Sequence, residues 1–248
     1  MSKFPKVAVL TLLSLFGSSL LSSSPIPSAL PASISLREKA SDLYSSINFA
    51  DAERPEFDMF SKAMEGYDRL KEADKLTDPE IITLIDFRKS GNEKRLWVIG
   101  LKSKKVLQYS LVAHGRNSGE VYARVFSNKP NSNKSSLGFY VTGGTYIGKH
   151  GLSLKLHGVE KGINDLAEAR AIVMHGADYV SESFIKKVGR LGRSLGCPAV
   201  PMENYKEIIT QIAGGTCLFI YYPDQEYLKN TKMYNPAPLE TTLARGDS

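Results

Sequence analysis

The chain has 248 residues, of which 42% are hydrophobic and 23% are charged, a composition that is ordinary for a globular protein and excludes a disordered one. The formal net charge of +6 favours an anionic partner, such as a cell wall, a membrane surface or a nucleic acid. No dense run of Lys and Arg with interleaved aromatic residues is present, so nucleic acid is the weakest of these partners and is not expected.

The N-terminus has the order of a secretory signal. Lys3 and Lys6 precede a mostly apolar stretch over residues 7–21, and small residues follow. The apolar stretch is too short for a typical transmembrane helix. Residues 1–32 are therefore predicted to be a signal peptide, and an uncleaved signal anchor, the only membrane attachment we expect, is the alternative. Both predict an exported protein, periplasmic or secreted and associated with the cell wall.

A helical segment is predicted over residues 33–77. It is rich in good helix formers, and Ser35 with Glu38 three residues later fits a capping box. Apolar residues recur at helical spacing at Phe57, Phe60, Met64, Tyr67 and Leu70. We expect this segment to pack on the main domain that follows.

The main domain is predicted over residues 78–228, where short apolar runs alternate with Gly- and Asn-rich loops. This pattern indicates a mainly β domain with a few helices, an α+β fold. The predicted strands cover residues 81–87, 95–101, 106–113, 138–142, 152–156, 171–174 and 217–222. One helix is expected over residues 202–212, a hairpin turn at Gly143-Gly144, and a loose polar tail over residues 229–248.

His175 and Cys197 form the candidate chemistry of this domain. His175 follows an apolar run, where a strand leaves the core, and Cys197 comes twenty-two residues later in a turn with Gly, Pro and basic residues. A thiol becomes a nucleophile when a base takes its proton, and basic neighbours favour the thiolate. Backbone N–H groups around Gly196 and Cys197 would then form an oxyanion hole. The residues alone equally fit a hydrogen-bonded histidine and an inert cysteine.

The run from Val173-Met174-His175-Gly176 to Ser194-Leu195-Gly196-Cys197 resembles the catalytic motif of the L,D-transpeptidase (YkuD-like) family, a strand-end His-Gly followed after a spacer by Ser-x-Gly-Cys. Further runs are similar to its divergent branch, the murein L,D-transpeptidase catalytic domain family. These runs are residues 113–116, 126–128, 135–140, 150–154 and 170–177. The resemblance covers roughly residues 80–228.

The resemblance implies an L,D-transpeptidase-like β-sandwich or barrel that acts on peptidoglycan stem peptides without a cofactor. Cys197 would attack the L,D bond of a tetrapeptide stem and release its terminal D-Ala, with His175 as the base. A carbonyl near Gly176 would orient the imidazole, and Ser194 would support the loop or bind substrate. The acyl group would pass to an amine of a second stem, and with water as acceptor the enzyme would be an L,D-carboxypeptidase.

Two positions depart from the family pattern. The family has His before the Gly-Cys pair and Arg two residues after the Cys, whereas this chain has Leu195 and Ala199. We expect Arg193 or Arg190 to replace the missing Arg and to bind a stem carboxylate in a two-pronged ion pair.

A zinc-dependent wall peptidase is an alternative. Zinc ligands would come from His114, His150, His157, His175 and Asp165, because zinc peptidases also act on wall peptides. The spacings of these residues match no known ligand signature, so no metal is expected.

A non-catalytic wall-binding domain with a Cys197–Cys217 disulfide is a second alternative, since two cysteines in an exported protein often pair. Against it, Cys217 lies in an apolar run typical of a buried strand, where cysteine behaves as a small hydrophobic residue. Residues 143–150 are close to a phosphate-binding loop, but His150 replaces the residue that binds Mg²⁺, so no nucleotide is expected.

Overall fold

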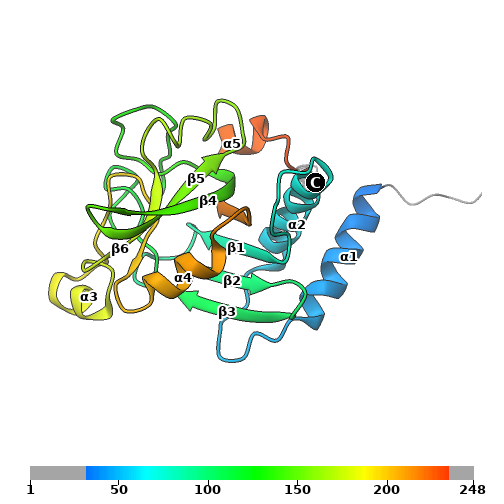
Figure 1. Ribbon diagram of the computed structural model, residues 1–248, viewed down its shortest axis with the longest axis horizontal. Coiled ribbons are helices and arrows are strands. Elements are labelled where there is room, and N and C mark those ends of the chain that lie inside the picture. Colours follow the sequence, from blue (N-terminus) through cyan, green and yellow to red (C-terminus); the bar gives the residue numbers. More distant parts are fainter. Residues whose placement is uncertain (1–31, 235–248) are drawn as a thin grey trace, which may run out of the picture. The chain divides into compact units, whose positions relative to one another are not determined.

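The computed structural model describes residues 32–234 (Figure 1). The predicted signal peptide lies outside the described residues except for Ala32, which is the first residue of helix α1 (Ala32–Ser46). Among the described residues, no helix combines the length and the apolar character that crossing a membrane requires.

One eight-stranded sheet forms the body of the domain. Its strands are β1 (Ile81–Asp86), β2 (Leu96–Gly100), β3 (Lys105–Ser110), β4 (Gly138–Gly148), β5 (Gly151–Gly158), β6 (Val173–Ala177), β7 (Ala199–Pro201) and β8 (Cys217–Tyr221). They are arranged in the order β3-β2-β1-β8-β4-β5-β6-β7. The pairs β1–β8 and β6–β7 are parallel, and the other neighbours are antiparallel.

The two ends of this sheet meet. After β3 the chain continues to Ala113, whose N–H donates to the carbonyl of Ala199 in β7 at 2.8 Å. The sheet is therefore nearly closed into a barrel, an arrangement that protects its edges. This confirms the mainly β fold with few helices that the sequence predicts.

Five helices accompany the sheet in the described part of the chain: α1, α2 (Phe57–Glu72), α3 (Glu182–Val188), α4 (Tyr205–Ile212) and α5 (Gln225–Asn230). Helix α4 confirms the helix expected within residues 202–212. Helices α3 and α5 were not expected, because each is too short to show a clear period. Each begins at a capping side chain, Ser181 for α3 and Asp224 for α5, which accepts a hydrogen bond from the first turn.

Helix α2 is part of the core of the domain. Met59, Phe60 and Leu70 on one of its faces are buried, and a Cβ on Gly66 would lie 2.1 Å from the Phe139 ring in β4. The absent side chain lets helix and strand approach closely. This confirms a helical N-terminal segment packed on the β domain. The predicted capping box is wrong, because α1 already includes Ser35.

The hairpin turn predicted at Gly143-Gly144 is also wrong. Strand β4 runs through these glycines to Gly148, and the hairpin closes at residues 149–150. The register between β4 and β5 shifts between Thr142 and Thr145, so the two glycines form an irregularity within the strand. Glycine inside a strand often marks such a bulge rather than a turn.

The chain beyond residue 228 is packed on the domain up to the last described residue. Helix α5 ends at Asn230, and the side chain of Tyr234 is only 1% exposed. Its ring lies 6.4 Å from that of Phe139 and 6.2 Å from that of Phe219. The predicted loose tail therefore begins too early at residue 229, and its residues 235–248 lie outside the described part.

Candidate active site

One cleft of about 500 Å³ brings together most of the residues that the sequence singles out. His175, Ser194 and Cys197 line it, as does Arg193. The rest of its wall comes from the β4–β5 hairpin, from residues 170–173 just before and at the start of β6, and from Tyr179 and Leu195. Strand β6 carries His175, and Cys197 lies two residues before β7, so the parallel pairing of β6 and β7 places the two on one side of the sheet edge.

His175 is held by its own backbone. Its Nδ1 lies 2.9 Å from the carbonyl oxygen of Gly176. A carbonyl only accepts, so Nδ1 carries the proton and Nε2 is left as a proton acceptor. The ring stacks on His150 at a centroid distance of 4.3 Å. Burial lowers the pKa of His175, so the imidazole is neutral at neutral pH. Position and protonation state both suit a general base.

The Cys197 thiol is half-buried beside the first residues of β6. Its Sγ accepts the N–H of Val173 at 3.5 Å and lies 3.7 Å from the Ala171 carbonyl. Burial raises the pKa of the Cys197 thiol, and the Val173 N–H, Arg170 and Lys149 oppose this rise only in part. Basic neighbours thus favour the thiolate as expected, but desolvation is the larger effect, so the thiol stays protonated in the resting protein.

Ser194 shapes the loop that presents the thiol. Its hydroxyl donates to the Cys197 carbonyl at 2.6 Å and accepts the Gly196 N–H at 3.0 Å. Gly196 has a φ of +129°, and a Cβ there would lie 2.9 Å from the Lys134 carbonyl, so only glycine fits. Since Ser194 occupies the Gly196 N–H, the backbone donor left is that of Cys197, which donates to no other described residue.

The two arginines expected to bind substrate are already engaged. Arg193 Nη1 donates to Glu120 Oε1 at 2.6 Å and to the carbonyls of Arg116 and Gly119 at 3.0 Å. Arg190 Nε lies 3.0 Å from Glu120 Oε2. Arg193 still lines the cleft, but its guanidinium ties the loop before Cys197 to residues 116–120. Both guanidinium groups are thus held by Glu120, and the binding of a stem carboxylate by either of them stays a prediction.

Arg170 is the cation at the thiol, and the sequence analysis did not single it out. It lines the cleft, and its charge lowers the pKa of Cys197. Its guanidinium donates to the carbonyls of Ser127 and Lys134 and to the hydroxyl of Ser136. It thereby holds the 127–136 loop, whose Ser135 hydroxyl in turn donates to the Gly196 carbonyl at 3.2 Å. The only signal in the sequence was its place at the start of the run 170–177.

The structure bears on both alternatives, the disulfide-linked wall-binding domain and the zinc-dependent peptidase. Cys197 and Cys217 are free thiols, so the disulfide is not formed. Of the predicted zinc ligands, His150 and His175 stack in the cleft, whereas His114 contacts Arg95, His157 pairs with Glu168 and Asp165 contacts Asn128. Within residues 32–234 no group of three His, Cys, Asp or Glu side chains could hold a metal ion.

Comparison with known proteins gives the family of the chain. The family model of the L,D-transpeptidase catalytic domain matches residues 51–221, well over half of the chain. The chain therefore belongs to the L,D-transpeptidase catalytic domain family. No curated protein matches.

Three solved structures illustrate the distant likeness. An L,D-transpeptidase from Mycobacterium smegmatis is 13% identical with a TM-score of 0.35, over 58% of this chain and 59% of its own. Mycobacterium tuberculosis L,D-transpeptidase 1 is 10% identical with a TM-score of 0.32, over 58% and 62%. An L,D-transpeptidase from Stackebrandtia nassauensis is 13% identical with a TM-score of 0.33, over 75% and 90%. The chain thus spans less than two thirds of the length of the two mycobacterial proteins.

Proposed function

We propose that this chain is an exported peptidoglycan L,D-transpeptidase in which Cys197 is the nucleophile and His175 the general base. The observation that carries the proposal is the hydrogen bond from His175 Nδ1 to the Gly176 carbonyl. It leaves Nε2 as an acceptor in the cleft that Cys197 also lines. A base fixed in this way by a third group is the arrangement that nucleophilic catalysis requires, and here the third group is a backbone carbonyl.

In the proposed reaction the Cys197 thiol gives its proton to His175 Nε2 as its sulfur attacks the carbonyl carbon of the L,D bond in a tetrapeptide stem. The C–N bond to the terminal D-Ala then breaks, and His175 returns the proton to the leaving amine. A thioester remains on Cys197. An amine from a second stem attacks this thioester, giving a cross-link and restoring the thiol. If water attacks instead, the product is a tripeptide.

The loop at the nucleophile supports the charge that develops on the attacked carbonyl oxygen. The Cys197 N–H donates to no other described residue and is the oxyanion donor of the proposal. Ser194 serves by holding the Cys197 carbonyl and the Gly196 N–H, which fixes the backbone on both sides of the nucleophile. Gly196 is thus the flexible link that permits this turn rather than a donor.

The test uses the purified full chain with disaccharide-tetrapeptide, read by mass spectrometry, beside the Cys197→Ala and His175→Gln variants. We expect a cross-linked dimer that lacks one D-Ala, absent in both variants. Tripeptide alone, again dependent on Cys197, would assign an L,D-carboxypeptidase. Cys217→Ala is the matched control, because it removes the buried thiol in β8 and should leave the product unchanged. Product formation by Cys197→Ala would overturn the proposal.

A further inference from the structure

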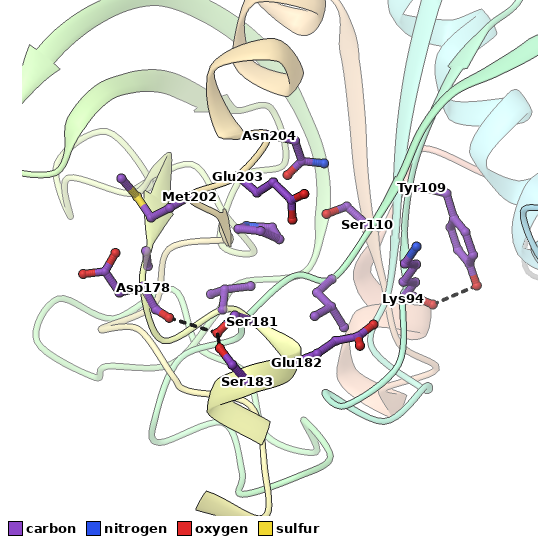
Figure 2. Close-up of a pocket in the computed structure, with 14 residues that line it drawn as sticks. Lys94, Tyr109, Ser110, Asp178, Ser181, Glu182, Ser183, Met202, Glu203 and Asn204 are labelled. Carbon is purple, nitrogen blue, oxygen red and sulfur yellow. Dashed lines mark hydrogen bonds between the residues drawn. The ribbon is translucent and has the colours of Figure 1, made fainter. Parts of the chain in front are cut away.

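A second cavity, of about 610 Å³, lies at the opposite ends of the strands that carry the active site. Strand β6 continues past His175 to its end at Ala177, Asp178 follows it, and β7 ends at Pro201; Ala177, Asp178 and Pro201 all line this cavity. The end of β3 and the first turn of α3 complete its wall (Figure 2). None of the residues that line it also lines the Cys197 cleft.

Unpaired carboxylates dominate the charge of this cavity. Asp178, Glu182 and Glu203 line it, and none of the three makes an ion pair or a side-chain hydrogen bond within the described residues. Lys94 is the one cation in the lining, and its ammonium lies 5.6 Å from the centre of the Tyr109 ring. Three uncompensated carboxylates around one hollow in a chain of net charge +6 form a local site for a cation.

Two buried polar groups without partners point to a ligand independently of the charges. Ser110 is only 2% exposed, yet its hydroxyl has no hydrogen-bond partner among residues 32–234. Figure 2 shows this hydroxyl and the Glu203 carboxylate turned toward the cavity. The Asn204 Oδ1 is buried and equally without a partner. Buried polar atoms in folded proteins are nearly always satisfied, so Asn204 Oδ1 needs a donor from outside the chain, and the Ser110 hydroxyl is available to the same ligand.

We propose that this cavity is a second, non-catalytic binding site for a peptide that carries a primary ammonium group. An ammonium has three donors, and the cavity offers it the Glu203 carboxylate and the Ser110 hydroxyl oxygen, with Glu182 as a further carboxylate in the lining. The apolar side chains of Leu111 and Val180 in the lining suit the methylene stem behind such a group. A metal ion is not the occupant, because these acids do not converge within the described residues as metal ligands would.

This inference rests on the proposed function only for the source of the ligand, which would be a wall stem peptide with a free side-chain amine. Such a site would hold one stem while the Cys197 cleft processes another, and so keep the protein on its polymer between turnovers. The two sites share strands β6 and β7 but no lining residue, so occupation of one leaves the other open.

The experiment titrates acetyl-alanyl-lysine amide, whose only charge is the side-chain ammonium, into ¹⁵N-labelled full chain with Cys197→Ala. The same peptide acetylated on its side-chain amine is the control ligand. We expect saturable shifts at the amides of Ser110, Glu182 and Glu203 with the first peptide and none with the second. The affinity, about millimolar for so small a ligand, should weaken with added salt because the carboxylates are exposed.

Substitution of the acids that line the second cavity tests whether they bind the ammonium group. Glu182→Gln with Glu203→Gln should weaken binding about tenfold or more, a factor that corresponds to ~1.4 kcal/mol. Glu72→Gln, an exposed acid outside the lining, should bind as the parent does. Equal shifts with the acetylated peptide, unchanged affinity in the double variant, or shifts confined to the Cys197 cleft would each overturn the inference. None of these results bears on the cross-linking assay of the wild-type chain, so the two proposals fail separately.

Discussion

Cys197 and His175 are both neutral in the resting protein. Burial raises the pKa of the thiol and lowers that of the imidazole, so each group keeps its uncharged form. In the proposed mechanism proton transfer therefore accompanies attack on the substrate, in contrast to enzymes that hold a preformed thiolate. The consequence is a thiol that is protected from unspecific reagents until substrate fills the cleft.

The first prediction concerns alkylation of Cys197. The rate with iodoacetamide should rise with pH to a midpoint above that of an ordinary cysteine, because desolvation disfavours the thiolate. Arg170→Ala should move this midpoint further up, since it removes a cation that lowers the thiol pKa. Arg193→Ala, whose guanidinium is tied to Glu120, should leave the midpoint in place. Intact-mass measurement of the alkylated protein over a pH series provides the test, and a midpoint below that of a free cysteine would contradict it.

The second prediction concerns the acid limb of the pH–rate profile. His175 must be neutral to accept a proton, and its pKa is lowered by burial. Activity should therefore be present above this lowered pKa and should fall only as the pH drops through it, below the ordinary range of histidine. Measuring kcat/KM for product formation from pH 4 to pH 8, at constant ionic strength, would show this, whereas an acid limb above the ordinary range would refute a buried neutral base.

At the residue scale, the sequence identifies those site residues that belong to one local motif. His175, Gly176, Ser194, Gly196 and Cys197 stand in one motif, and the structure brings them to one loop and one strand end. It does not reveal Arg170, whose guanidinium meets carbonyls more than thirty residues away along the chain. It also gives no sign that Glu120 is the partner of Arg193, which only the fold shows. Long-range pairs leave no trace in a single sequence.

Elements with strong periodicity are predicted well, and those defined by caps or bulges are not. The buried runs of β1, β2 and β8 and the apolar face of α4 appear where the sequence places them. Helices α3 and α5 escape prediction because each has only six or seven residues. The Gly143-Gly144 pair has the composition of a turn, and only the pairing of β4 with β5 shows that the strand continues through it.

The third prediction tests the element after α5. Tyr234 is buried against the rings of Phe139 and Phe219, so Tyr234→Ala should lower the free energy of unfolding by ~3 kcal/mol. Tyr234→Phe keeps the ring and should cost less than ~1 kcal/mol. Urea denaturation of each variant gives the comparison, with Lys232→Ala as an exposed neighbour that should be neutral. An equal free energy of unfolding for Tyr234→Ala and the parent would instead support a loose tail that begins at residue 229.

At the scale of the whole molecule, helix α2 and the barrel-like sheet share one hydrophobic core. The family match agrees, since it begins at residue 51, before α2. The sequence indicates that a helical segment precedes the β domain, but its composition gives no sign that the two are inseparable. That dependence follows from this shared core, within which α2 closely approaches the ring of Phe139 at Gly66.

The fourth prediction follows from this shared core. A chain that begins at residue 78 should not fold, because Phe139 and its neighbours would lose the cover that Met59, Phe60 and Leu70 provide. A chain that begins at residue 33 should fold like the full protein. Circular dichroism with urea titration distinguishes them, and a cooperative transition in the shorter chain would show that the β domain is independent.

The order of strands in the sheet has a consequence for how the chain acquires its structure. Strand β1 pairs with β8, joining Ile82 to Cys217 across most of the described chain, and β8 then joins β4. The centre of the sheet is thus completed by β8, the last strand along the described part of the chain. Contacts between such distant segments slow folding, commonly to milliseconds or longer. An incomplete chain would keep the flanks of β1 and β4 unpaired, so the protein gains its structure, and with it any activity, in one late step.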